Sequence, residues 1–159
     1  MGLLYAGLML TDDGPRVLEF NCRFGDPETQ SILPRVDGDF LGALRDAASG
    51  ALGDVELRAA DEAAVTIVIA AADALDRGDV GTPIHGVDEA ADAGALVFHA
   101  GTALRSGTLV TNGRRILNVT GLGATLGEAR DAAYAAAERI SFDGMRYRRD
   151  IASEAARVG

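Results

Sequence analysis

The stretch RVLEFNCRFGDPETQ, residues 16–30, predicts a strand that leads into a helix. Polar and apolar side chains alternate along its first half, which places them on opposite faces of a strand. Gly25 lets the chain turn, and Pro27 suits the first turn of a helix that begins near Glu28. One strand face is therefore expected to be apolar and the other polar.

A second strand is predicted just before this stretch. Residues 3–10 (LLYAGLML) are apolar, and the turn-forming run TDDGP, residues 11–15, separates them from the strand at 16–24. The two segments predict a β-hairpin. Two strands alone are marginally stable in water, so we expect residues 1–50 to be the tail of a larger sheet.

Helical and strand-like segments follow the hairpin. Helices are predicted over 28–33 and 39–48, with Pro34 between them, and the mixed stretch 51–63 is the expected boundary of two domains. Beyond it, strands rich in β-branched residues are expected at 64–71, 95–104, 108–112 and 115–120. The run TLGE, residues 125–128, is a capping box that opens a long helix reaching Ile140. These segments predict an α+β fold.

Composition narrows the classes of function. The chain has 159 residues, with 24 acidic and 15 basic residues and a net charge of −9, which disfavours nucleic-acid and membrane partners. All basic residues are arginine, so no lysine is present to form a Schiff base or to hold ATP phosphates. The only cysteine, Cys22, excludes an internal disulfide and favours a reducing, cytoplasmic setting.

The polar face of the strand carries candidate ligands. Glu19, Asn21 and Arg23 are spaced by two residues and so are expected to share one face, about 6.6 Å apart along the strand. A carboxylate and an amide oxygen suit one Mg²⁺ ion, and the arginine fork suits phosphate oxygens. By spacing alone, an ordinary solvated face remains the commoner interpretation. Cys22 is expected on the apolar face as a buried small side chain.

Two acidic residues follow the strand. Asp26 and Glu28 stand at the turn made by Gly25, where they are available to an amine or to ribose hydroxyls.

Near the other end of the chain, Arg146, Arg148 and Arg149 form a basic cluster. Pairing with nearby acids is the commoner outcome for such a cluster, and phosphate binding is the alternative.

Residues 19–30, EFNCRFGDPETQ, closely resemble the signature of the phosphoribosylamine-glycine ligase family, also called glycinamide ribonucleotide synthetases, of the ATP-grasp superfamily. The Glu-x-Asn-x-Arg part is similar to ATP-grasp ligases in general, whereas RFGDPETQ is far more specific to this family. Further similarity covers nearly the whole chain, in YAGLM at 5–9, VFHAGT at 97–102, LNVT at 117–120 and FDGMRYRRDI at 142–151.

The resemblance implies roles for particular residues. Glu19 and Asn21 match ligands of Mg²⁺ or Mn²⁺, and Arg23 matches a catalytic residue beside the phosphates. On the substrate side of the pocket the matching residues are Gly25, Asp26 and Glu28, and Arg115 matches the nucleotide end. The implied domains are the C-terminal portion of the ATP-grasp domain at 1–60 and the family's C-terminal domain at 61–159.

The implied reaction joins glycine to 5-phosphoribosylamine in de novo purine (IMP) biosynthesis. ATP phosphorylates the glycine carboxylate, and the amine attacks the acyl phosphate, which releases ADP and phosphate and leaves glycinamide ribonucleotide. The family's N-terminal part has no counterpart here, so that part is an expected partner and this chain alone is expected to be inactive.

Two alternatives stay open beside this interpretation. The chain could be an inert binding or scaffold module that keeps the fold, or it could belong to another ATP-grasp carboxylate-amine ligase, against which GDPETQ argues. One departure affects a loop: where the family has a Gly-rich segment, residues 72–77 are ADALDR.

Overall fold

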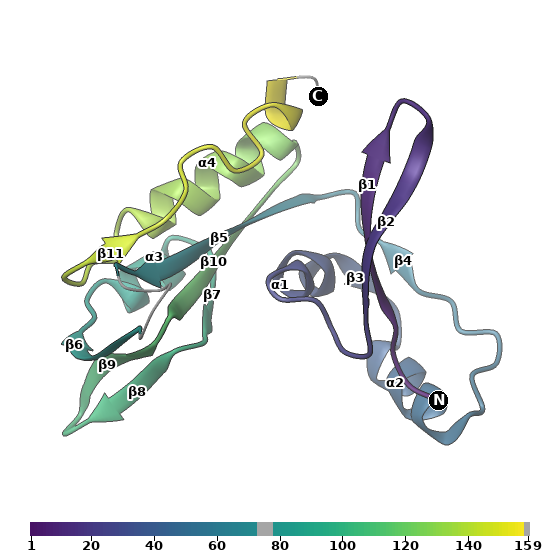
Figure 1. Cartoon of the computed structure of the whole chain (residues 1–159), viewed down its shortest axis with the longest axis horizontal. Coiled ribbons are helices and arrows are strands. Elements are labelled where there is room, and N and C mark those ends of the chain that lie inside the picture. Colours follow the sequence, from purple (N-terminus) through teal and green to yellow (C-terminus); the bar gives the residue numbers. More distant parts are fainter. Residues whose placement is uncertain (73–77, 158–159) are drawn as a thin grey trace. The chain divides into compact units, whose positions relative to one another are not determined.

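The computed structural model describes residues 1–72 and 78–157 and divides into two compact units, Met1–Ala60 and Asp61–Gly159 (Figure 1). Each unit has its own elements and is described by itself. Of the loop at 72–77 that departs from the family pattern, residues 73–77 lie outside the described residues.

The first unit begins with the predicted hairpin. Strand β1 (Tyr5–Thr11) pairs antiparallel with β2 (Gly14–Asn21), and the side chain of Thr11 donates to the Gly14 carbonyl across 2.7 Å at the turn. The register shifts between Gly7 and Leu8, which leaves Leu18 as an extra, bulged residue and interrupts the strict alternation of faces there. β2 ends at Asn21 rather than at residue 24, so the predicted strand is too long.

Short helices complete this unit. Helix α1 (Glu28–Ile32) leads into the 3₁₀ turn η1 (Leu33–Arg35), and α2 (Phe40–Ser49) follows. Asp39 caps α2, since its Oδ1 accepts from the Gly42 amide across 2.8 Å, and Gly50 closes it with a φ of 72°. A two-residue ladder joins β3 (Val36–Asp37) to β4 (Arg58–Ala59). Both predicted helices are confirmed.

The second unit is built on a four-stranded antiparallel sheet in the order β11-β5-β10-β7. Its strands are β5 (Ala63–Ala71), β7 (Leu96–His99), β10 (Arg115–Gly123) and β11 (Met145–Arg146). Helix α4 (Leu126–Ala137) packs against β10 and β5 (Figure 1). The capping box is confirmed: Thr125 Oγ1 accepts from the Glu128 amide across 3.1 Å, and Glu128 Oε2 accepts from the Ala124 amide across 3.0 Å.

The hydrophobic core of the second unit lies between this sheet and α4. Val65, Ile67 and Ile69 alternate along β5 with half-buried residues and are at most 3% exposed. The alanines of α4 that face the sheet are almost fully buried, and Gly121 of β10 lies against the helix backbone. Small residues on both sides let the helix approach closely, which explains why an alanine-rich segment forms a packed layer.

A three-stranded sheet in the order β6-β9-β8 completes the second unit. It contains β6 (Asp79–Pro83), β8 (Thr102–Arg105) and β9 (Thr108–Gly113), while α3 (Val87–Asp92) and η2 (Ala155–Arg157) lie outside the sheets. The predicted strand at 95–104 is therefore wrong as one element, because β7 and β8 belong to different sheets. The break falls at Gly101, where a Cβ would lie 2.6 Å from the Arg115 carbonyl oxygen and no larger residue fits.

Both units combine helices with antiparallel strands, which confirms the predicted α+β class. None of the helices in the described part of the chain has both the length and the hydropathy that a bilayer crossing needs.

Candidate functional site

The hairpin aligns four residues in one row. The register pairs Tyr5 with Asn21 and Gly7 with Glu19. Directly paired residues of an antiparallel ladder project from the same face, so these four positions share one face of the hairpin. Gly7 leaves room for the glutamate, since a Cβ there would lie 3.2 Å from Cγ of Glu19. The β1 strand thus contributes an open position at Gly7 beside Glu19 and an aromatic side chain, Tyr5, beside Asn21.

The side chains of Glu19 and Asn21 meet on this face. Nδ2 of Asn21 donates to Oε1 of Glu19 across 2.9 Å. A half-turn of the amide exchanges Nδ2 for Oδ1 at nearly the same place and would present two oxygens instead. Neighbouring ligands of an octahedral Mg²⁺ ion, each at about 2.1 Å from the metal, lie about 3 Å apart. The donor types and the spacing of this pair therefore fit a hard divalent cation.

A cation at this pair would need more ligands than the described residues supply. No group of three or more His, Cys, Asp or Glu side chains arranged to hold a metal occurs in residues 1–72 or 78–157. Magnesium commonly binds one or two protein oxygens and completes its shell with water and substrate phosphates. The pair is consistent with a cation that arrives together with a phosphorylated substrate.

The turn after β2 is held by its own hydrogen bonds. Both the amide and the hydroxyl of Thr29 donate to the Gly25 carbonyl, across 3.3 and 2.6 Å. A Cβ on Gly25 would lie 2.5 Å from Oε2 and 3.0 Å from Cβ of Glu28, so a larger residue there would push this carboxylate away from the turn. Nε2 of Gln30 donates to Oδ1 of Asp26 across 3.1 Å. The two predicted substrate-binding acids are thus positioned by the α1 segment.

Tyr5 is a further candidate for the site, which the strand pattern alone did not reveal. Partial burial, the hydrogen bond to Glu28 and the negative charges of Glu28 and Glu19 together raise the pKa of the Tyr5 hydroxyl. The hydroxyl therefore links the turn carboxylate to the Glu19–Asn21 face. Its signal in the sequence lies in the hairpin register, because only the pairing places Tyr5 opposite Asn21.

Arg23 lies beyond the end of β2, so strand alternation does not orient it. Its Nη1 donates to the neighbouring Phe24 carbonyl across 2.7 Å, and its positive charge acts on the Tyr5 hydroxyl. Cys22 also lies beyond the strand and is exposed. The prediction that Cys22 is buried is wrong, because the apolar side chains of β2 before it, such as Phe20, are themselves exposed.

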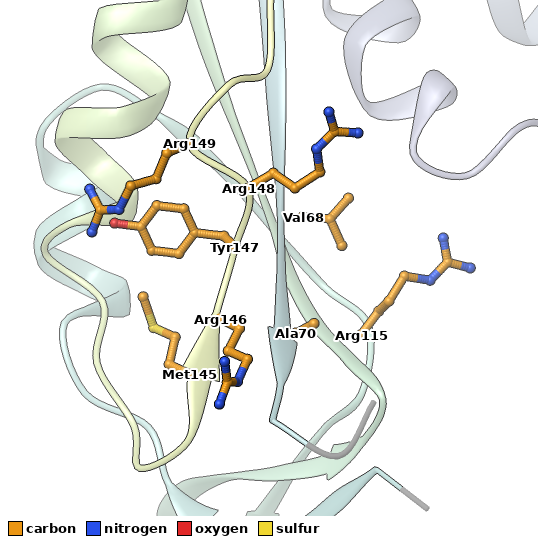
Figure 2. A pocket seen from close by; sticks show the side chains of 8 residues that line it. All are labelled: Val68, Ala70, Arg115, Met145, Arg146, Tyr147, Arg148 and Arg149. Carbon is orange, nitrogen blue, oxygen red and sulfur yellow. The ribbon is translucent and has the colours of Figure 1, made fainter. Parts of the chain in front are cut away.

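Arg115 belongs to the second unit, at the first position of β10. It lines a pocket of about 680 Å³ together with residues of β5 and of the segment from Met145 to Arg149 (Figure 2). In the first unit, a smaller and largely apolar pocket of about 290 Å³ reaches Tyr5, Phe24 and Gly25. The described residues therefore offer one pocket beside the hairpin site and one around Arg115.

Comparison with known proteins places both units in one family. Residues 64–154 match the family described as "Phosphoribosylglycinamide synthetase, C domain", and residues 1–29 match "Phosphoribosylglycinamide synthetase, ATP-grasp (A) domain".

Several curated relatives are named phosphoribosylamine-glycine ligase. The phosphoribosylamine-glycine ligase of Mesorhizobium japonicum is 50% identical, with 97% of this chain and 36% of that protein covered. The ligase of Streptomyces coelicolor is 52% identical, with 98% and 38% covered. A crystal structure of the Thermotoga maritima ligase matches with a TM-score of 0.77 and 42% identity over 93% of this chain and 36% of that chain. The chain thus spans a little over a third of the length of these relatives.

Proposed function

Because the chain belongs to the phosphoribosylamine-glycine ligase family, we propose that it supplies the metal-binding part of an enzyme that joins glycine to 5-phosphoribosylamine. In the proposed reaction ATP phosphorylates the glycine carboxylate, the amine attacks the acyl phosphate, and ADP and phosphate leave. The product is glycinamide ribonucleotide, an intermediate of purine biosynthesis. Unit Met1–Ala60 would be the C-terminal portion of the ATP-grasp domain and the second unit the C-terminal domain.

The contact between Glu19 and Asn21 carries this proposal. The two side-chain heads lie 2.9 Å apart on one face of the hairpin, as two ligands of one Mg²⁺ or Mn²⁺ ion would. The cation, when bound, would offset the negative charge of nucleotide phosphates. Tyr5 lies opposite Asn21 on the neighbouring strand, and Gly7 leaves the space that Glu19 occupies.

Arg23 and the turn acids supply the remaining contacts of the proposal. The bond from Arg23 to the Phe24 carbonyl is local and exposed, so the guanidinium can exchange it for phosphate oxygens and bind them with its planar fork. Asp26 and Glu28, carried on the turn at Gly25, are acceptors for the amine or for the ribose hydroxyls. Arg115 of the second unit keeps the nucleotide-binding role that the family resemblance implies.

The proposed partner is the N-terminal part of the same enzyme. The apolar side chains of the hairpin are open: Leu18 is 64% exposed and Phe20 is 60% exposed. Apolar side chains of this size on a two-stranded sheet favour burial against further structure. Residues 1–29 match the ATP-grasp domain, which supports the proposal that the rest of that domain buries these apolar side chains. A cytoplasmic location remains a prediction from the single cysteine.

A chimeric enzyme tests the proposal. Residues 1–159 replace the matching C-terminal segment of the Streptomyces coelicolor ligase, and ADP release is measured with glycine and 5-phosphoribosylamine. We expect activity from the chimera and a loss of about 100-fold or more in its Glu19→Ala variant, because a metal ligand that acts on the transferring phosphate is removed. The control is Asp13→Asn, an exposed acid at the hairpin turn, which should retain full activity.

Two outcomes would contradict the proposal. Unchanged activity of the Glu19→Ala chimera would make Glu19 an ordinary surface residue. An inactive chimera beside an active parent enzyme would favour the inert module. Electron paramagnetic resonance of Mn²⁺ gives a readout apart from turnover: the ion should be retained by the wild-type chimera in the presence of ATP and lost from the Glu19→Ala variant.

A further inference from the structure

A single run of residues forms one wall of the pocket around Arg115. Five of the eight residues that line this pocket are consecutive, from Met145 to Arg149, and the other three lie on β5 and β10. In Figure 2 this run, which we call the pocket wall, passes along one side of the pocket, and Arg115 lies on the other side. The width of the pocket therefore depends on where the pocket wall stands.

Strand pairing holds only the beginning of the pocket wall. Met145 pairs with Ala71 and Arg146 pairs with Ala70, and β11 ends at Arg146. The remaining three residues of the wall, 147–149, follow the end of the strand. Contacts of another kind must hold this second half of the wall in place.

The ion pairs of the second half are too exposed to do so. Arg148 forms a fork with Asp150, which belongs to the same run of chain and does not attach it to other elements. Arg149 lies 3.6 Å from Glu138 at the end of α4, and their side chains are 74% and 60% exposed. Exposed ion pairs of this kind contribute little to stability.

Two side chains of α4 bind the backbone of this segment. The Tyr134 hydroxyl donates to the Arg148 carbonyl across 2.8 Å and accepts from the Ile151 amide across 3.1 Å. Nη2 of Arg130 donates to the Arg149 carbonyl across 3.1 Å, and its Nε donates to the Ile151 carbonyl across 2.9 Å. All four bonds end on the backbone, so they fix where the chain runs whatever side chains it carries.

Arg130 and Tyr134, which we call the α4 pair, also hold each other. They are four residues apart and so share one face of the helix. The Arg130 guanidinium lies 4.7 Å from the centre of the Tyr134 ring, and the arginine side chain is only 25% exposed. Both residues lie outside the eight that line the pocket. The α4 pair therefore acts on the pocket through the backbone that it binds.

We propose that Arg130 and Tyr134 are positioning residues that hold the pocket wall in place opposite Arg115. This inference rests on the proposed function, which includes the nucleotide-binding role of Arg115. A wall that is ordered before the ligand arrives costs less conformational entropy on binding. Loss of the α4 pair should therefore weaken nucleotide binding and leave the chemical step at the hairpin unchanged.

Affinity and turnover are measured separately in the chimeric ligase. Tyr134→Phe keeps the ring and loses the hydroxyl, and Arg130→Gln loses the guanidinium. Each variant should raise the KM for ATP, and the Kd of Mg·ATP measured by calorimetry, by about fivefold or more, because each loses two hydrogen bonds to the segment. The kcat and the KM for glycine should stay within about twofold of the wild type.

Further variants separate position from charge. Arg130→Lys should bind ATP more weakly than the wild type, since an ammonium keeps the charge but cannot bond both carbonyls as the planar fork does. The control Arg139→Gln removes the same charge from an exposed residue just beyond α4 and should leave the affinity unchanged. An Arg130→Lys variant that binds like the wild type, or an equal loss in the control, would overturn the inference.

Two measurements follow the segment itself. Hydrogen exchange measured by mass spectrometry should be faster in peptides of residues 145–151 in Tyr134→Phe and Arg130→Gln and unchanged in Arg139→Gln. Because both residues hold one segment, the double variant should weaken ATP binding by much less than the product of the two single effects. Exchange as slow as in the wild type, or fully multiplicative effects, would contradict the shared anchor. Circular dichroism confirms that each variant is folded.

The outcomes distinguish this inference from the proposed function. An active chimera whose α4 variants bind ATP like the wild type would overturn the inference alone. Variants that lose kcat and the affinities for ATP and glycine together would also overturn it, because a general folding defect behaves in this way. If the chimera is inactive but binds Mg·ATP, the proposed function fails, and the inference holds only if the α4 variants weaken that binding. A wild-type chimera that binds no Mg·ATP would overturn both.

Discussion

Replacement of Gly121 by alanine tests how tightly α4 packs on β10. A Cβ at this position would overlap the amide nitrogen of Ala133 and the carbonyl oxygen of Ala129, and it would lie 2.9 Å from the Cα of Ala133. All three atoms belong to the helix backbone, so no side-chain rotation can make room. The helix itself has to move away from the sheet.

The size of that movement sets the expected loss of stability. Carbon atoms pack at about 3.5 to 4.0 Å, so α4 must retreat by roughly 0.6 to 1.1 Å. A gap of that size removes a quarter to a half of the dispersion energy of each contact across it. The affected contacts include those of Ala129, Ala133 and Ala137, all 0% exposed. Overpacking of this kind costs about 1 to 3 kcal/mol.

Thermal unfolding measures the effect. For a unit of this size, each kcal/mol lowers the melting temperature by about 4 to 8 °C, so Gly121→Ala should lower it by roughly 4 to 24 °C. Hydrogen exchange measured by mass spectrometry should show faster exchange in peptides of β10 and α4. The matched control is Gly127→Ala on the same helix, where the nearest atom to a new Cβ is Thr125 Oγ1 at 3.8 Å.

The control should be neutral or more stable by up to about 1 kcal/mol, because alanine favours helix over glycine. A Gly121→Ala chain that melts within 1 °C of the wild type, beside a control that behaves as expected, would refute the close packing of α4 on β10.

Two further predictions concern titrating groups. Glu28→Gln removes a negative charge beside Tyr5, so the raised pKa of Tyr5 should fall part of the way toward 10.0. A pH titration followed by absorbance at 295 nm, with the signal of the Tyr5→Phe variant subtracted, measures the pKa of Tyr5. An unchanged titration would contradict the contact between Tyr5 and Glu28. The hydrogen bonds from Thr82 and Thr111 lower the pKa of Asp79 below 3.8, so its stabilising effect is complete above pH 3.8 and is lost as the pH falls through the folded-state pKa. Asp79→Asn should therefore lower the free energy of unfolding at pH 7 by about 1 kcal/mol or less, and the difference from the wild type should be smaller at pH 2.5. Chemical unfolding at pH 7 and at pH 2.5 measures the two differences. Equal differences at the two pH values would contradict the stabilising role of the Asp79 carboxylate.

Short-range patterns were sufficient to predict much of the fold. The turn residues at 11–15, the helix after Gly25 and the capping box at Thr125 depend on neighbours along the chain, and the structure has each of them. The metal-ligand prediction for Glu19 and Asn21 needed more than their spacing of two residues, because it depended on the resemblance of residues 19–30 to the family signature. Local geometry repeats in every strand or helix, so the sequence reveals it directly.

Patterns of neighbouring residues could not predict the contacts between segments that are distant in the sequence. The break at Gly101 arises from its approach to Arg115, and the end of β2 at Asn21 follows from where the partner strand begins. Tyr5 joins the hairpin site only because it pairs with Asn21. The pocket around Arg115 forms where β10 and β11 flank Ala70 from two sides. Each depends on which strands pair and in which register, and pairing is set by burial across the whole unit rather than by adjacent residues.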